Sequence, residues 1–181
     1  MTDPLTYTTI TADELARLHL AMHEAAHAVA GILLGATNVR AAIGDARSGG
    51  VTRCYGLPAD YEPLVAFAGP WAEARWQAGQ RPKLPEVWRH LDGCGRRDRD
   101  QIVSTFGTSV PPTSYRVERL LEMTWPAVVS VAQVLHRTSE ARYDDICAAL
   151  DIPETDNAHH LAAIGSGTWP VRITRPRLSA D

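Results

Sequence analysis

Residues 11–34 carry the feature that most constrains the fold, a long segment with a helical pattern and no proline. Thr11 and Glu14 have the capping-box spacing that begins a helix, and Gly35 supplies a stop at the other end. One face of the segment is apolar, with residues at spacings of three and four: Leu15, Leu18, Met22, Ala26, Val29 and Leu33. The pattern predicts one largely buried helix of about six turns.

His23, Glu24 and His27 form an H-E-x-x-H sequence inside this helix. Residues four apart share a helix face about 6 Å apart along the axis, so both imidazoles can bind one zinc ion. Glu24 projects about 100° around the helix, toward the open side of the metal, where a general base acts on water. The alternative is a helix whose histidines are satisfied by hydrogen bonds in the core. His19 lies about 12 Å from His27 along the axis, so we expect it at the surface or behind the ligands.

A third zinc ligand must come from later in the chain, because catalytic zinc usually has three protein ligands and this helix supplies two. The extended pattern H-E-x-x-H-x-x-G-x-x-H is absent. The candidates are acidic or histidine side chains beyond the helix: His90, His136, Glu73, Asp92, Asp98 and Asp100.

Composition excludes several classes of function. The chain has 181 residues, enough for one domain, and its formal net charge of −3 favours neither nucleic acid nor a membrane surface as a partner. It has no apolar run of about 18 residues and no recognisable signal peptide, so we expect no membrane span. The cysteines at positions 54, 94 and 147 lack the spacing of a disulfide framework or zinc finger. We therefore expect reduced thiols in a cytoplasmic protein.

The remaining patterns predict a mainly α fold, of the α+β type, with a small two-stranded β element. Extended segments at 39–43 and 51–55, joined by a turn-rich loop, favour a hairpin. Further helices are expected at 60–78, 96–106, 113–125, 126–137 and 142–150. The domain organisation predicted is a polar lead at 1–10, a domain at 11–150 with a loop at 79–95, and a disordered tail at 151–181.

Four segments carry a family resemblance. His23-Glu24-Ala25-Ala26-His27-Ala28-Val29-Ala30 is similar to an H-E-A-G-H-A-x-x helix, and Phe67-Ala68-Gly69-Pro70-Trp71-Ala72-Glu73-Ala74 to an L-A-G-R-x-A-E-E helix. Gly50-Val51-Thr52 resembles the glycine-containing strand between them, and Gly95-Arg96-Arg97-Asp98-Arg99-Asp100-Gln101-Ile102 falls where an N-D-L-x-x-A helix begins. These motifs together resemble the peptidase domain of the FtsH-type zinc metallopeptidase family.

The resemblance implies a helical, zincin-like metallopeptidase domain with Zn²⁺ as its cofactor. Carried over by position, His23 and His27 would bind the metal and Glu24 would be the general base. Asp98 would be the third ligand, and Asp100 is the alternative. Both aspartates also fit a solvated acidic turn at a helix N-terminus, which the helix dipole favours.

Glu73 has two possible roles in this picture. It would either orient a ligating histidine or form an ordinary ion pair with Arg75 or Arg99. The sequence leaves the two roles open.

The functional expectation is a zinc-dependent metalloendopeptidase that hydrolyses peptide bonds in proteins or peptides with a zinc-activated water. The chain contains no G-x-x-x-x-G-K-[ST] sequence, so we expect an ATP-independent enzyme acting on flexible protein or peptide substrates. A substrate strand would add to the sheet edge at 51–54. The alternative is a non-catalytic, zinc-stabilised regulatory or protein-binding domain that retains the fold, although Glu24 favours catalysis.

A further, weaker hypothesis concerns the C-terminal segment. Trp169 with Arg172, Arg175 and Arg177 would dock a partner or an anionic surface. The alternative for the same residues is a solvated, unstructured end.

Overall fold

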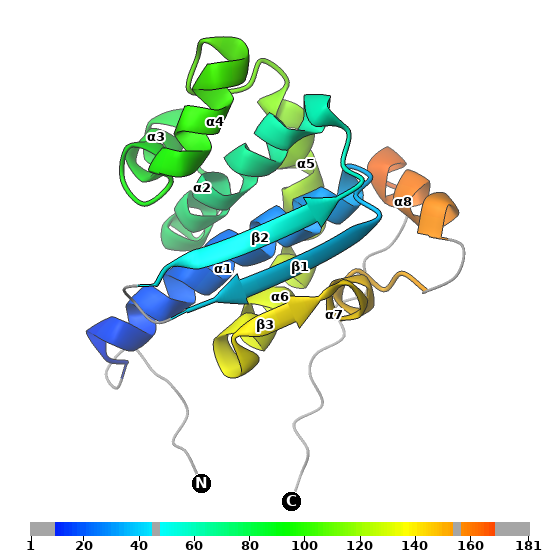
Figure 1. Cartoon of the computed structure of the whole chain (residues 1–181), viewed down its shortest axis with the longest axis horizontal. Helices are drawn as coiled ribbons and strands as arrows, with labels where there is room; N and C mark the ends of the chain where they lie inside the picture. Colours follow the sequence, from blue (N-terminus) through cyan, green and yellow to red (C-terminus); the bar gives the residue numbers. More distant parts are fainter. Residues whose placement is uncertain (1–9, 45–47, 154–156, 169–181) are drawn as a thin grey trace, which may run out of the picture.

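Helices pack around one long central helix and a small antiparallel sheet in a computed structural model of the chain (Figure 1). The structure describes residues 10–44, 48–153 and 157–168. The helices are α1 (Ala12–Leu33), α2 (Glu62–Ala78), α3 (Leu84–Asp92), α4 (Arg96–Phe106), α5 (Ser114–Met123), α6 (Trp125–Thr138), α7 (Tyr143–Ala149) and α8 (Asn157–Ser166), with a 3₁₀ turn, η1 (Ala59–Tyr61), before α2. The strands are β1 (Asn38–Ile43), β2 (Gly50–Tyr55) and β3 (Glu140–Arg142). The expected mainly α, α+β class is confirmed.

Helix α1 forms the centre of the core, as its sequence predicts. The capping box is present, since Thr11 accepts a hydrogen bond from the Glu14 amide and the Glu14 carboxylate accepts one from the Thr11 amide at 2.8 Å. Every residue from 21 to 32 is buried, because α1 packs on α2 and α6 and lies against both long strands. A Cβ at Gly31 would come within 2.5 Å of the Cys54 sulfur, so glycine permits this close approach of helix and sheet.

The sheet contains one strand more than predicted. Strands β1 and β2 form the expected antiparallel hairpin, and β3 pairs with the other side of β1, which gives the order β2-β1-β3. The two-stranded prediction was therefore wrong. The third strand has only three residues, too few for an alternating pattern, and its pairing depends on a partner about a hundred residues earlier. Among the described residues β2 pairs only with β1, so its outer edge carries no further strand.

Helix α2 runs beneath the site as one continuous element. Pro63 lies in its first turn, and the helix ends at Gly79, which has a φ of 67°. Pro70 lies inside the helix without ending it, in a stretch where residues 63–74 are all buried. Burial on this scale stabilises the helix despite the backbone hydrogen bond that a proline removes.

Two helices occupy segments that the sequence predicts to have no regular secondary structure. Helix α3 lies within the expected loop at 79–95, anchored by the buried Val87 and Leu91. Helix α8 lies within the expected disordered tail at 151–181 and buries Ile164 completely, so that expectation was wrong for residues 157–166. Residues 1–9 of the predicted lead at 1–10, and the docking hypothesis on Trp169 and the nearby arginines, lie outside the described residues.

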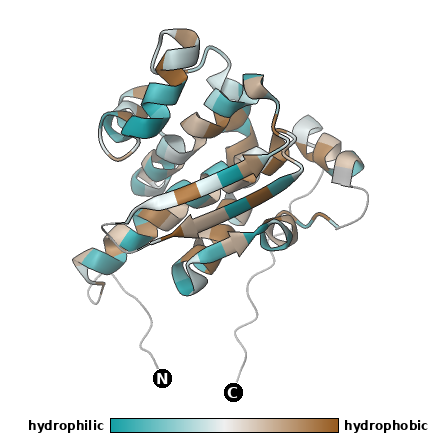
Figure 2. Cartoon of the chain, in the orientation of Figure 1, coloured by the Kyte–Doolittle hydropathy of each residue, from teal (hydrophilic) through white to brown (hydrophobic). Residues whose placement is uncertain are grey.

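Hydropathy distinguishes helices α3 and α4 from the centre of the fold. Hydrophobic residues concentrate around α1 and its neighbours, whereas α3 and α4 carry mostly hydrophilic residues (Figure 2). Within the described part of the chain, none of the helices combines the length and the apolar character that crossing a bilayer requires.

Candidate metal centre

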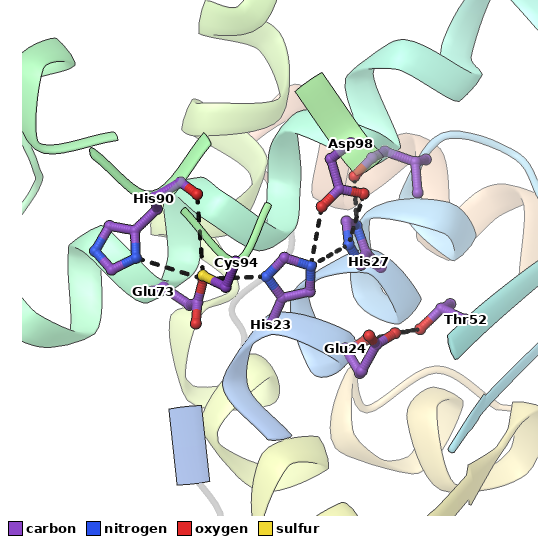
Figure 3. Close-up of polar contacts among 9 residues, drawn as sticks. His23, Glu24, His27, Thr52, Glu73, His90, Cys94 and Asp98 are labelled. Carbon is purple, nitrogen blue, oxygen red and sulfur yellow. Dashed lines mark hydrogen bonds and ion pairs between the residues drawn. The ribbon is translucent and has the colours of Figure 1, made fainter. Parts of the chain in front are cut away.

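Three predicted ligands converge where the first turn of α4 approaches the middle of α1. The Nε2 atoms of His23 and His27 are 2.9 Å apart on adjacent turns of α1. One oxygen of Asp98 lies 3.1 Å from the His23 Nε2, and its other oxygen lies 3.4 Å from the His27 Nε2. Figure 3 shows the three side chains pointing toward one another, and we call them the histidine–aspartate cluster.

The outer nitrogen of each imidazole already has an acceptor. The His27 Nδ1 lies 2.7 Å from the Val65 carbonyl oxygen, and the His23 Nδ1 lies 3.2 Å from a Glu73 carboxylate oxygen. Because a carbonyl oxygen only accepts, the His27 Nδ1 carries the hydrogen and its Nε2 presents a lone pair. The same reasoning assigns a lone pair to the Nε2 of His23 when that ring is neutral. Two lone pairs and a carboxylate therefore face one another, an arrangement that a bound cation stabilises.

The separations fit a single metal ion. Ligand atoms at about 2.0–2.1 Å from a four-coordinate zinc are roughly 3.3 Å from one another. The three ligand groups are separated by 2.9, 3.1 and 3.4 Å. A Cβ at Gly69 would lie 2.6 Å from the His27 Nε2 and 2.7 Å from the His23 Nε2, so only glycine leaves this space open. The donor set and the space beside it both fit a divalent transition metal.

Asp98, rather than Asp100, joins the two histidines. Asp98 is in the first turn of α4, and Ile102, one turn later, is fully buried against α2 and holds that face inward. Asp100 lines the neighbouring cavity but belongs to neither potential metal-binding group among the described residues. Of the other candidates, Asp92 and His136 also join neither group.

The charges of the metal-free site are strongly coupled. Burial opposes protonation of His23, but Asp98 and Glu73 outweigh it and raise the pKa of His23 to about 10. Burial alone would raise the pKa of the Asp98 carboxyl, but the nearby His27 and His23 outweigh it and hold this pKa below its ordinary value. The metal-free cluster therefore keeps a proton that a metal ion would displace.

Glu24 points away from the ligands, toward the sheet. Its carboxylate accepts a 2.6 Å hydrogen bond from the Thr52 hydroxyl of β2, and Figure 3 shows this pair beside the histidines. A Cβ at Gly50 would lie 2.5 Å from the Glu24 carboxylate, so a glycine is required there as well. The glutamate is thus held between helix and strand, and only 5% of its surface is exposed.

A cavity of about 1230 Å³ borders all of these groups. Its walls include the ligand histidines and Glu24 on α1, the edge strand β2, and the start of α4. The site therefore faces a space large enough for an extended peptide segment.

Glu73 lies behind the histidine–aspartate cluster and contacts His23. The alternative pairings are wrong, because Arg75 pairs with Glu122 at 2.9 Å and Arg99 pairs with Asp92 at 3.0 Å. Burial opposes ionisation of Glu73, but hydrogen bonds from His23 and His90 hold its pKa well below the usual range.

His19 lies on the same side of α1 without joining the ligands. Its Nδ1 is 3.9 Å from Glu73, and its ring packs edge-on against Trp76. The expectation that His19 lies behind the ligands fits this position.

A second group of potential ligands surrounds Glu73, and we call Glu73, His90 and Cys94 the cysteine cluster. The Cys94 thiol donates to a Glu73 oxygen at 2.9 Å, and the His90 Nδ1 lies 3.5 Å from the same oxygen. From the sequence, His90 is expected only as a candidate for the third ligand, Glu73 as a candidate ligand, a partner of a ligating histidine or an ion-pair residue, and Cys94 in no metal site. The four-residue spacing of His90 and Cys94 was the only signal available.

Comparison with known proteins adds no identification. No protein-family model matches the chain, and no curated protein sequence matches it. The interpretation of the site therefore depends on its residues and their geometry.

Proposed function

We propose that this protein is a zinc-dependent metallopeptidase that hydrolyses peptide bonds in proteins or peptides. The main support is the histidine–aspartate cluster, whose three potential ligands converge near Gly69. Glu24 lies apart from them, at the cavity wall. Two histidines and a carboxylate are a donor set typical of catalytic zinc, which keeps an exchangeable position. The resemblance of the chain to the FtsH-type peptidase domain supports the same proposal.

A zinc ion in this cluster would supply Lewis acidity, which polarises a carbonyl and makes water a stronger acid. Glu24 then accepts the proton of the attacking water and delivers it to the leaving amine. The Thr52 hydroxyl, at 2.6 Å, holds the carboxylate in place at the cavity wall through this transfer. His27 and His23 are held in orientation by the Val65 carbonyl and by Glu73.

The edge of β2 offers a place for the substrate backbone. Among the described residues this strand pairs on one side only, with β1; it lines the cavity through Gly50, Val51 and Thr52 and contacts Glu24. An extended peptide that adds to this edge as a further strand would run past Glu24. Such binding requires an unfolded or flexible segment, so the substrate class is a peptide or an exposed protein loop.

The Glu24→Gln variant tests this function. It removes the general base while leaving all three ligands, so hydrolysis of unfolded casein should fall by about 10²–10⁴-fold with the zinc content unchanged. Glu62→Gln is the matched control, because it makes the same chemical change at an exposed residue of the same cavity wall. Glu62→Gln should retain the activity of the wild type.

Two results would contradict the proposal. One is a Glu24→Gln variant that cleaves casein as fast as the wild type. The other is wild-type activity that persists after a chelator has removed all zinc. A zinc-loaded wild type with no hydrolytic activity would instead favour the regulatory or protein-binding domain.

A further inference from the structure

The cysteine cluster brings three different ligand chemistries to one point. Glu73 comes from α2, His90 from α3, and Cys94 from the turn between α3 and α4. Their ligand atoms all lie within 4.8 Å of one another, and the Glu73 oxygen is the common neighbour of the other two (Figure 3). Carboxylate, imidazole and thiolate together form a donor set typical of Zn²⁺ and of ions with similar preferences.

The backbone fixes the cysteine in this position. The amides of Gly93 and Gly95 both donate to the His90 carbonyl oxygen, at 3.1 and 2.9 Å, which folds the turn back over α3. A Cβ at Gly95 would lie 2.6 Å from the Pro70 ring, so the turn packs directly on α2. The sulfur therefore lies over Glu73 because of the shape of the turn, and not only because of its own hydrogen bond.

An ion has a route into this cluster. The side chains of Glu73 and His90 are 4% and 13% exposed, whereas Cys94 is an exposed residue. All three also line the large cavity, which supplies an open coordination position. The existing separations of 2.9 and 3.5 Å are close to the roughly 3.3–3.6 Å expected between ligands of one tetrahedral zinc.

We propose that Glu73, His90 and Cys94 form a second transition-metal site, distinct from the histidine–aspartate cluster. On binding, the Cys94 sulfur gives its proton to solvent and the thiolate becomes a ligand beside the His90 Nδ1 and the Glu73 carboxylate. The two sites meet at Glu73, which also accepts from the His23 Nδ1. This site does not depend on the proposed hydrolytic activity.

Titration of the metal-free protein with Co²⁺ tests the proposal, because only the cysteine cluster contains sulfur. The wild type should bind two equivalents, and the near-ultraviolet thiolate-to-cobalt band should grow with one of them. Cys94→Ser should bind one equivalent and lose the band. Cys54→Ser is the matched control, since Cys54 also lines the cavity, and it should keep the band.

Two further variants separate the sites. His27→Ala should keep the thiolate band, because it disrupts only the histidine–aspartate cluster. His90→Ala should weaken the binding that produces the band while the protein stays folded by circular dichroism. A wild type without the band, or a Cys94→Ser variant that keeps it, would overturn the second site. A band in a protein that fails to hydrolyse casein would leave this site standing while the proposed function fails.

Discussion

The histidine–aspartate cluster and the cysteine cluster meet at one imidazole ring, yet they are prepared for a metal to different degrees. In the histidine–aspartate cluster the outer nitrogens of both histidines have acceptors, so in the neutral rings the inner lone pairs face the site. In the cysteine cluster the thiol and the imidazole both turn toward a single Glu73 oxygen. This difference indicates that hydrogen bonds to the outer nitrogens of the ligating histidines preorganise a metal site more than the types of ligand do. We expect the histidine–aspartate cluster to bind metal more tightly.

We expect Gly69→Ala to have the largest effect on the difference in metal affinity between the two clusters. The added Cβ would lie within 2.7 Å of both Nε2 atoms, so it should occupy the space of the ion and reduce zinc affinity by more than about 100-fold. Overpacking should also lower the free energy of unfolding by about 1–3 kcal/mol. Competition with a chromophoric chelator and thermal unfolding measure the two effects.

The matched control for Gly69→Ala is Gly165→Ala in α8. A Cβ at Gly165 meets no atom within 4 Å, and alanine favours helix, so stability should stay equal or rise by up to about 1 kcal/mol. Full zinc affinity in Gly69→Ala would show that the ion does not bind beside this glycine.

Glu73→Gln should affect both clusters at once, because Glu73 belongs to the cysteine cluster and also contacts the His23 Nδ1 of the histidine–aspartate cluster. The amide oxygen of glutamine is a weaker, uncharged acceptor for the His23 Nδ1 and makes His23 a less basic ligand, so zinc affinity at the histidine–aspartate cluster should fall by about 10–100-fold. The thiolate-to-cobalt signal should also weaken. Isothermal titration of Glu73→Gln beside Cys94→Ser separates the effects, since Cys94→Ser should leave zinc affinity at the histidine–aspartate cluster unchanged. Equal zinc affinities in Glu73→Gln and the wild type would show that Glu73 does not couple the two clusters.

Thr52→Val separates catalysis from metal binding at both clusters. It removes the hydrogen bond to the Glu24 carboxylate without touching a ligand, so kcat should fall about tenfold while zinc content is unchanged. Thr52→Ser retains the hydroxyl and should recover most of the rate. Steady-state kinetics on a fluorogenic peptide gives the comparison, and an unaltered kcat in Thr52→Val would exclude this orienting role.

Arg99→Ala should have the smallest effect, although its ion pair joins the two helices that flank both clusters. Arg99 and Asp92 are 3.0 Å apart but are 42% and 66% exposed, and such pairs contribute less than about 1 kcal/mol. Denaturant unfolding should therefore shift only slightly, with both metal equivalents retained. Loss of either equivalent would mean that the α3–α4 surface matters more than the buried contacts.

Local patterns were enough to predict the central helix, the hairpin and the two histidines of the histidine–aspartate cluster, whereas Asp98 was expected from the family resemblance. The capping box of α1 and the spacing of His23 and His27 are both short-range signals. These signals work because each depends on residues within one or two helical turns.

The missed features depend on contacts between distant segments. Strand β3 is too short to show a period and forms by pairing with β1. Helix α3 was hidden by the glycines and prolines around it, and α8 by the Pro, Gly, Ser and Arg residues of the segment 151–181, although it buries Ile164 completely. The significance of Cys94 appears only when the fold brings it beside Glu73, 21 residues earlier.

The way in which α4 contacts the rest of the fold affects its local unfolding. In α4, all of whose residues the structure describes, only Ile102 is buried, and Asp98 is its link to α1. An ion bound by Asp98, His23 and His27 would fasten this weakly packed helix to the most deeply buried one. Local opening of α4 then requires release of the ion, so slow amide hydrogen exchange in α4 reports metal occupancy even in a protein that is not turning over.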